Sequence, residues 1–215
     1  MSSKQDSKML ALSYIKDQIV TCEMQPGSLI QIDEIAEALN ISKTPVREAL
    51  LELQYENYVT IIPRKRTVVR KISLQELKDI YDARTLVEPY IIQELTPEAI
   101  EANRELLTSL NETWSKIHIH SQSREAYIDF LKSDLEFHQK IVQMNSNSCL
   151  TNFCSELIYK SQRFWYMALF NNELDVVQKE HLKILDYLIC GNMHAAAEYT
   201  KKHISISKAL SILSE

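Results

Sequence analysis

The sequence predicts a mostly α-helical protein with one small β-hairpin, and three observations support this fold class. Only two glycines, Gly27 and Gly191, occur in 215 residues. That is too few for the many tight turns of an all-β sandwich, and it excludes both the P-loop and the dinucleotide-binding glycine loop. Apolar residues recur at helical spacing over most of the chain. Paired β-branched runs occur only between residues 58 and 69.

The composition is that of a soluble globular protein. Hydrophobic residues make up 45% of the chain, and 24 Lys and Arg stand against 29 Asp and Glu, for a net charge of −5. We find no apolar run long enough to cross a bilayer and no signal peptide, so we expect a cytoplasmic protein. The four cysteines form no CxxC pair, which favours reduced thiols. One segment departs from the acidic average: residues 43–71 contain seven basic and three acidic residues.

Residues 1–71 have the pattern of a winged helix-turn-helix. Helical periodicity predicts helices over 8–22 and 33–39 and a third that begins near Thr44. The short polar break between the second and third helices is typical of a helix-turn-helix. Two β-branched runs then flank four residues, 63–66, which predicts a hairpin with a cationic tip. A hairpin beside a recognition helix is a wing, and the outward residues of that helix would face base edges and phosphates.

The stretch 26–50 closely resembles the DNA-binding signature of the GntR family of bacterial transcription regulators. This resemblance implies that operator DNA is contacted by six residues: Ser42, Lys43, Thr44, Arg47, Arg64 and Lys65. Arg47 would then contact guanine. Two positions depart from the family pattern, since the chain has Asn57 and Arg66 where glycine is usual. Asn tolerates the left-handed backbone conformation, so the first departure is mild. The second leaves open the path of the wing.

Residues 72–215 predict an all-α bundle of six helices. The pattern places them at about 73–93, 96–117, 124–144, 148–170, 174–189 and 193–212. A polar stretch, 118–123, separates the second from the third, and Gly191 lies in the turn before the sixth. We expect no strand in this half of the chain.

Four residues of this bundle have spacing that suits a metal site. Asp134 and His138 are four apart on one predicted helix and therefore share a face. His181 and His203 lie at nearly equal distances on either side of the turn at Gly191, about 16 Å from it at 1.5 Å per residue. One carboxylate and three imidazoles suit Zn²⁺, Ni²⁺ or Mn²⁺. Spacing alone leaves open that these are ordinary core or surface residues, the reading we give to His118, His120 and His194.

The same residues resemble the FCD domain of the FadR subfamily of GntR regulators, and the six-helix form resembles its VanR-like branch. The pattern comprises Asp134, His138, His181 and His203, and the segment 77–88 resembles the start of the domain. This resemblance implies that the four residues bind a divalent metal that anchors a small carboxylate effector. Arg84 is the predicted second contact with that effector, and Arg163 is a weaker candidate.

These observations lead to a functional prediction with two alternatives. The chain is predicted to be a transcription regulator, a repressor that binds double-stranded operator DNA as a homodimer. We expect the helices near 73–117 to form the dimer interface. We expect domains at 1–71 and 72–215, and no membrane contact. A metal-dependent hydrolytic enzyme is the main alternative, because an open Asp/His site can activate water. It lacks a recognisable general base, and it leaves the winged helix unexplained. A structural DNA-binding protein without an effector is the third reading.

Overall fold

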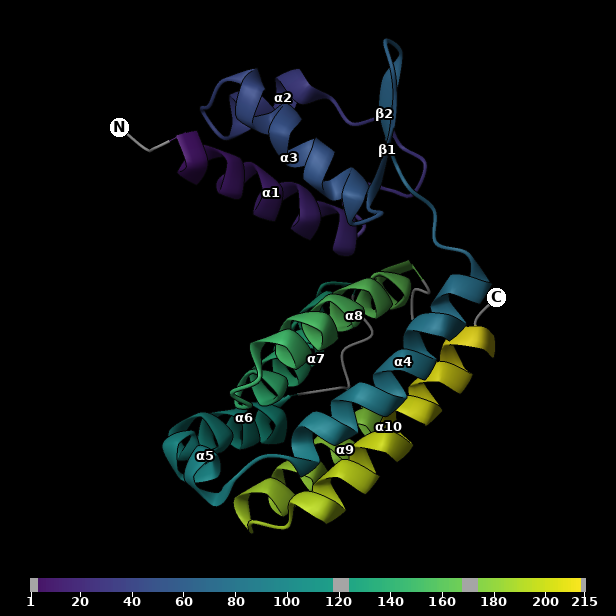
Figure 1. Cartoon of the computed structure of the whole chain (residues 1–215). Coiled ribbons are helices and arrows are strands. Elements are labelled where there is room, and N and C mark those ends of the chain that lie inside the picture. Colours follow the sequence, from purple (N-terminus) through teal and green to yellow (C-terminus); the bar gives the residue numbers. More distant parts are fainter. Residues whose placement is uncertain (1–3, 118–123, 168–173, 214–215) are drawn as a thin grey trace. The chain divides into compact units, whose positions relative to one another are not determined.

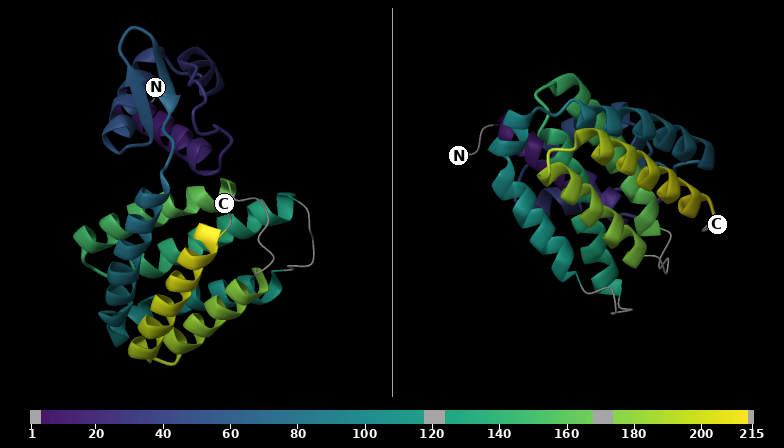
Figure 2. Two further views of the ribbon diagram at one scale, coloured as in Figure 1. Left: turned by 90° about the vertical axis from the view of Figure 1, so that its right-hand side faces the viewer. Right: turned by 90° about the horizontal axis from the view of Figure 1, so that it is seen from below.

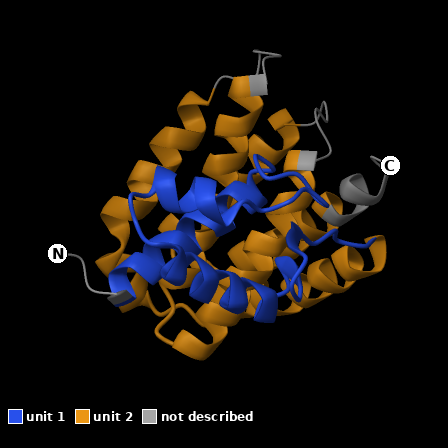
Figure 3. Ribbon diagram, turned by 90° about the horizontal axis from the view of Figure 1, so that it is seen from above, with its two compact units in different colours: residues 1–73 blue, residues 74–215 orange. Residues whose placement is uncertain are grey.

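The computed structural model describes residues 4–117, 124–167 and 174–213. The chain divides into two compact units, Met1–Ser73 and Leu74–Glu215 (Figure 3). The division falls two residues from the boundary that we placed after Lys71. The predicted fold class is confirmed: a helix-turn-helix with a two-stranded hairpin is followed by a helical bundle.

Residues 4–73 of the N-terminal unit form three helices and one hairpin (Figure 1). The helices are α1 (Lys4–Val20), α2 (Ile32–Ala38) and α3 (Lys43–Tyr55), and the strands are β1 (Val59–Ile62) and β2 (Arg66–Val69). The strands pair antiparallel, with Val59 opposite Val69 and Ile62 opposite Arg66. α1 and α3 pack against each other through their apolar faces in the core of this unit. The opposite, polar face of α3 is therefore exposed.

The two glycine departures have different structural outcomes. Asn57 has φ 66°, so it adopts the left-handed conformation that we expected after the third helix. Arg66 instead begins β2 and needs no such conformation. The left-handed residue of the hairpin tip is Arg64, with φ 58°, and the turn is closed by the bond from Lys65 N–H to the Ile62 carbonyl, 3.1 Å. The wing of this chain therefore turns without glycine.

The second unit is an all-α bundle (Figures 1 and 2). Within the described residues its helices are α4 (Leu74–Gln93), α5 (Pro97–Ala102), α6 (Arg104–Lys116), α7 (Arg124–Gln143), α8 (Ser148–Met167), α9 (Leu174–Ile189) and α10 (Met193–Leu213). The predicted helix over 96–117 is divided at Asn103, whose side chain bonds the Ala99 carbonyl at 2.8 Å. The separator 118–123, with His118 and His120, and the predicted end of the fourth helix at 170 lie outside the described residues.

The packing of the bundle brings the predicted ligand-bearing helices together. α4 packs against both α8 and α10, while α7 packs against α8 and α9 against α10. A buried apolar cluster of Ile91, Val142, Cys154 and Ile158 joins α4, α7 and α8. The helix packing thus holds α7, α9 and α10 around one interior region. No helix among the described residues combines the length and apolarity that a bilayer span requires.

Candidate metal centre and nucleic-acid interface

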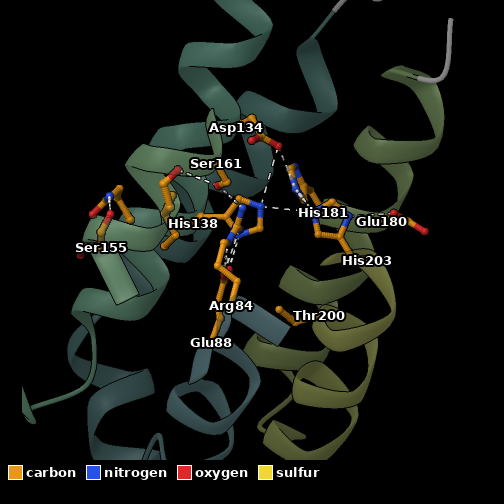
Figure 4. Close-up of polar contacts among 12 residues, drawn as sticks. Arg84, Glu88, Asp134, His138, Ser155, Ser161, Glu180, His181, Thr200 and His203 are labelled. Carbon is orange, nitrogen blue, oxygen red and sulfur yellow. Dashed lines mark hydrogen bonds and ion pairs between the residues drawn. The ribbon is translucent and has the colours of Figure 1, made fainter. Parts of the chain in front are cut away.

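The four predicted ligands lie together in the interior of the bundle. Asp134 and His138 come from α7, His181 from α9 and His203 from α10 (Figure 4). Each offers one ligand atom, and these atoms all lie within 4.8 Å of one another. The three imidazoles are buried, and Asp134 is partly exposed.

The distances between the ligand atoms are those of groups that face a common centre. The Nε2 atoms of His181 and His203 are 3.2 Å apart, and those of His203 and His138 are 3.3 Å apart. Asp134 Oδ1 lies 3.5 Å from His181 Nε2. Three nitrogens and one oxygen are a donor set that divalent transition metals accept.

Two buried carboxylates fix the orientation of two of the imidazoles. Glu88 of α4 bonds His138 Nδ1, and Glu180 Oε2 accepts a bond from His203 Nδ1 at 2.8 Å. A carboxylate only accepts hydrogen bonds, so the single proton of either ring in its neutral form lies on Nδ1. Their Nε2 lone pairs then face each other at 3.3 Å, an arrangement that repels unless a cation or proton lies between them. The residues therefore fit a bound cation.

His181 is held by aromatic contacts. Its ring stacks on Phe137 at a centroid distance of 3.9 Å and meets the edge of Trp114 at 4.2 Å. Burial, reinforced by His203 and His138, keeps the pKa of His181 well below its usual 6.5. A neutral imidazole is the form that coordinates a metal.

Arg84 and Glu88 form a buried ion pair beside this cluster. Arg84 donates to Glu88 Oε2 through Nε at 3.1 Å and Nη2 at 2.9 Å, and Nη1 donates to Ser161 Oγ at 2.7 Å. Burial alone would raise the pKa of Glu88, but Arg84 and then His138 outweigh it and lower the pKa to about 2. Burial likewise opposes the charge of Arg84, and Glu88 raises the pKa of Arg84 above its ordinary value. Glu88 is thus a carboxylate that joins α4 to a ligand on α7.

A small cavity of about 30 Å³ adjoins the cluster. Arg84 lines it together with Asp134, His138 and His203, so the structure brings this predicted effector contact to the ligands. Arg163 is buried on α8 but is not one of the lining residues. Of the two predicted effector contacts, only Arg84 lies at the cavity.

From the sequence we predicted no role for Glu88 or Glu180, although Glu88 lies within the segment 77–88 that resembles the start of the FCD domain. Both are buried acids, with exposed fractions of 1% and 5%, on helix faces that are mostly apolar. A charged residue that falls on the apolar face of a predicted helix is the signal that could have identified them, because buried charges need partners.

The predicted DNA contacts of the recognition helix lie on one exposed surface. Ser42, Lys43, Thr44 and Arg47 are all exposed at the start of α3. The Ser42 hydroxyl makes no cap hydrogen bond to the helix. Lys43 Nζ reaches Asp33 Oδ2 at 2.9 Å on the surface, a pair that a phosphate can replace.

The wing presents its cations beside the same helix. Arg64, Lys65 and Arg66 are exposed, and they line a shallow hollow that also includes Arg47. A helix and a cationic hairpin on one surface can read a major groove and hold the adjacent backbone.

Two family models match the chain, one on each side of the boundary between the two units. The model described as "FCD domain" matches residues 79–205, and the model described as "Bacterial regulatory proteins, gntR family" matches residues 11–69. The matches fall within the helical unit and the winged-helix unit respectively.

Individual relatives extend over nearly the whole chain. The HTH-type transcriptional regulator YdhC of Bacillus subtilis (strain 168) is 22% identical over 197 residues, covering 90% of this chain and 85% of the relative. The HTH-type transcriptional repressor RspR of Escherichia coli (strain K12) is 24% identical over 179 residues, covering 81% and 75%. The solved structure of E. coli McbR/YncC superposes with a TM-score of 0.77 at 21% identity, covering 99% of each chain, which supports the same fold.

Proposed function

The chain belongs to the GntR family of bacterial transcription regulators that carry an FCD domain, and we propose that it is a repressor controlled by a divalent cation and a small carboxylate. DNA binding belongs to residues 1–71 in this proposal, and ligand binding and dimerisation belong to 72–215. The family consists of transcriptional regulators, so the alternative of a hydrolytic enzyme is set aside.

The observation that carries the proposal is the convergence of four ligand atoms from three helices. Asp134, His138, His181 and His203 are the proposed ligands of Zn²⁺, Ni²⁺ or Mn²⁺. Four buried or partly buried polar groups would be costly to bring together without a partner. The paired carboxylates of Glu88 and Glu180 support the same conclusion, because ligand imidazoles usually donate their other N–H to such groups.

Arg84 is the proposed second contact with a carboxylate effector. Its guanidinium lines the cavity beside the ligands, and a carboxylate could bind the cation and this side chain together. When bound, the cation supplies a Lewis-acidic anchor for the carboxylate. The protein side chains orient the ligand and exclude water from it.

The short linker before α4 suggests how ligand binding could affect the DNA-binding unit. β2 ends at Val69 and α4 begins at Leu74, so a short linker separates the wing from the helix that carries Arg84 and Glu88. A ligand that moves these two side chains acts on the first helix after the wing.

Observations other than the metal site support repression and dimerisation. RspR is named a repressor, and dimeric winged helices match the two-fold symmetry of operators. α4 also exposes Leu86 and Tyr90, one turn apart, with exposed fractions of 72% and 50%. A pair of large exposed apolar side chains favours contact with a second copy.

The test uses the full chain, purified without chelator or affinity-tag metal and then loaded with zinc, nickel or manganese in turn. We expect one metal per chain in the wild type and much less in His203→Ala. His194→Ala is the matched control, because His194 is exposed on the same helix. A DNA duplex selected from a random pool then reports whether metal and small carboxylates change DNA affinity.

Two results would contradict the proposal. Equal metal content in the wild type and His203→Ala would remove the site. Metal binding without any effect of metal or carboxylate on DNA affinity would leave a DNA-binding protein whose metal is only structural.

A further inference from the structure

The cavity beside the four proposed metal ligands has walls that are mostly apolar. Besides the ligands, six apolar or aromatic residues from α7, α8, α9 and α10 line it: Phe130, Leu131, Trp165, Leu174, Val177 and Ile204. Such walls favour contact with a hydrocarbon group of a ligand, because that group needs no hydrogen bonds.

The cationic partners in the cavity suffice for one carboxylate. Of the described residues that line it, only Arg84 carries a permanent positive charge. A guanidinium has five N–H donors, and the bonds to Glu88 and Ser161 use three of them. The remaining donors, together with a bound cation, can satisfy one carboxylate group of a ligand.

Among the described residues that line the cavity, a second charged group on the ligand would find no partner comparable to Arg84. Apart from the metal ligands and Arg84, Ser207 is the one polar residue among the described lining residues. A second carboxylate would lose its hydration against Leu, Val and Ile side chains, and burial of an unpaired charge is strongly unfavourable.

The volume also limits the ligand. A cavity of about 30 Å³ has room for about two water-sized groups, so its walls must move apart to admit even a four-carbon acid, and a compact ligand requires the least movement. From the apolar walls, the single arginine and the small volume, we infer that the effector is a monocarboxylate with a short apolar tail. The inference rests on the proposed metal-dependent control, and it names the chemical class of the ligand for that site.

Butyrate and succinate provide a matched test, because both have four carbons and they differ in a terminal methyl or carboxylate group. Calorimetric titration of the zinc-loaded full chain should show butyrate binding at least about tenfold more tightly than succinate, because the second carboxylate of succinate would be buried without a partner. Zinc content is measured on the same sample before titration.

A pair of variants tests whether the cavity causes the preference. Val177 lines the cavity, while the adjacent Val176 is 37% exposed and does not line it. Val177→Lys adds a second cation beside the ligand and should lower the ratio of butyrate to succinate affinity by about tenfold or more. Val176→Lys, with the same added charge on the same helix, should leave the ratio within about twofold. Leu174→Lys, at the half-buried first residue of α9, serves where Val177→Lys does not fold.

The outcomes separate this inference from the proposed function. If succinate binds as tightly as butyrate, or if Val176→Lys changes the ratio as much as Val177→Lys, the inference is overturned and carboxylate control survives. If the zinc-loaded protein binds neither acid nor any other carboxylate, the effector part of the proposed function fails. If the wild type takes up no zinc, nickel or manganese, the metal site itself fails.

Discussion

Exposure and burial distinguish the two sets of charged residues to which we assign a function. Arg47 and Lys65 are exposed cations of the winged helix, where a phosphate or a base edge can reach them. Arg84 and Glu88 are a buried pair with exposed fractions of 4% and 1%. Buried charges must be satisfied inside the protein, so they can transmit a change at the ligand site, whereas exposed charges meet a partner from solvent.

Arg47→Ala should remove one specific base contact. We expect affinity for a selected duplex to fall by about 1–3 kcal/mol, with relaxed preference at one base pair. Lys65→Ala, in the wing, should instead weaken specific and non-specific DNA alike and reduce the salt slope by about one phosphate. Arg104→Ala is the control, since Arg104 is exposed in the helical unit and pairs with Glu101. Wild-type affinity of Arg47→Ala in a mobility-shift titration would refute the proposed docking.

Because His181 is buried, we expect the metal-free protein to lose stability in mild acid. Burial lowers the pKa of His181 in the folded state below its unfolded value of 6.5. The unfolded chain therefore binds more protons, and the free energy of unfolding should fall as pH drops below about 6.5, by up to about 1.4 kcal/mol per pH unit for this residue. Urea denaturation at pH 7.5 and 5.5 measures the effect.

The matched variants for this pH dependence are His181→Gln and His194→Ala. His181→Gln should flatten the decline, because it removes the buried titrating group. His194→Ala should retain the decline, because His194 is exposed. Equal stability of the wild type at both pH values would show that burial of His181 imposes no cost on protonation.

At the scale of elements, the ligand cluster is a junction of helices. α7, α9 and α10 supply the proposed metal ligands, and Glu88 adds α4 through its contact with His138. Glu180 and His203 tie α9 to α10. The four helices are therefore linked by polar contacts within a mostly apolar interior.

Substitution of either carboxylate should weaken metal binding without abolishing it. Glu88→Gln and Glu180→Gln both keep the side-chain size but replace a charged acceptor, so metal affinity should fall by about 10–100-fold. Glu136→Gln is the control, because Glu136 pairs with Lys140 on the exposed side of α7. Competition with a coloured chelator measures the affinity, and unchanged values for both variants would contradict the orienting role of these carboxylates.

Local sequence signals predicted the elements better than they predicted the surroundings of the site. Helical periodicity placed 174–189 where α9 lies, and the equal spacing of His181 and His203 from Gly191 placed them at one level. The break at Asn103 depends on a side chain competing for the Ala99 carbonyl, which periodicity does not contain. The bond of Glu88 to His138 joins residues 50 apart, so it depends on how α4 packs on α7.

At the scale of the whole molecule, the charge is uneven in a way that favours two copies. The basic residues gather in 43–71, but residues 1–71 as a whole have only one more basic than acidic residue. A DNA-binding unit with so little net charge binds an operator more tightly as part of a dimer. Once the first copy is on the operator, the second copy binds at a high effective concentration.

Leu86→Glu should dissociate the proposed dimer. Leu86 lies on α4, in the segment 73–117 from which the sequence predicted the interface, and 72% of it is exposed in the single chain. Burying a carboxylate against a second copy would be unfavourable, so the dimer dissociation constant should rise at least about tenfold. Sedimentation of the full chain at micromolar concentration measures it.

The control for the dimer is the same substitution in the other unit. Leu51→Glu places a carboxylate at a residue of α3 that is 61% exposed, and it should leave the wild-type dimer unchanged. Leu86→Glu should also bind a duplex with two half-sites little better than one with a single half-site, because the gain from effective concentration needs a dimer. If Leu86→Glu remained as dimeric as Leu51→Glu, the interface would lie elsewhere on the chain, and the exposed pair of Leu86 and Tyr90 would need another partner.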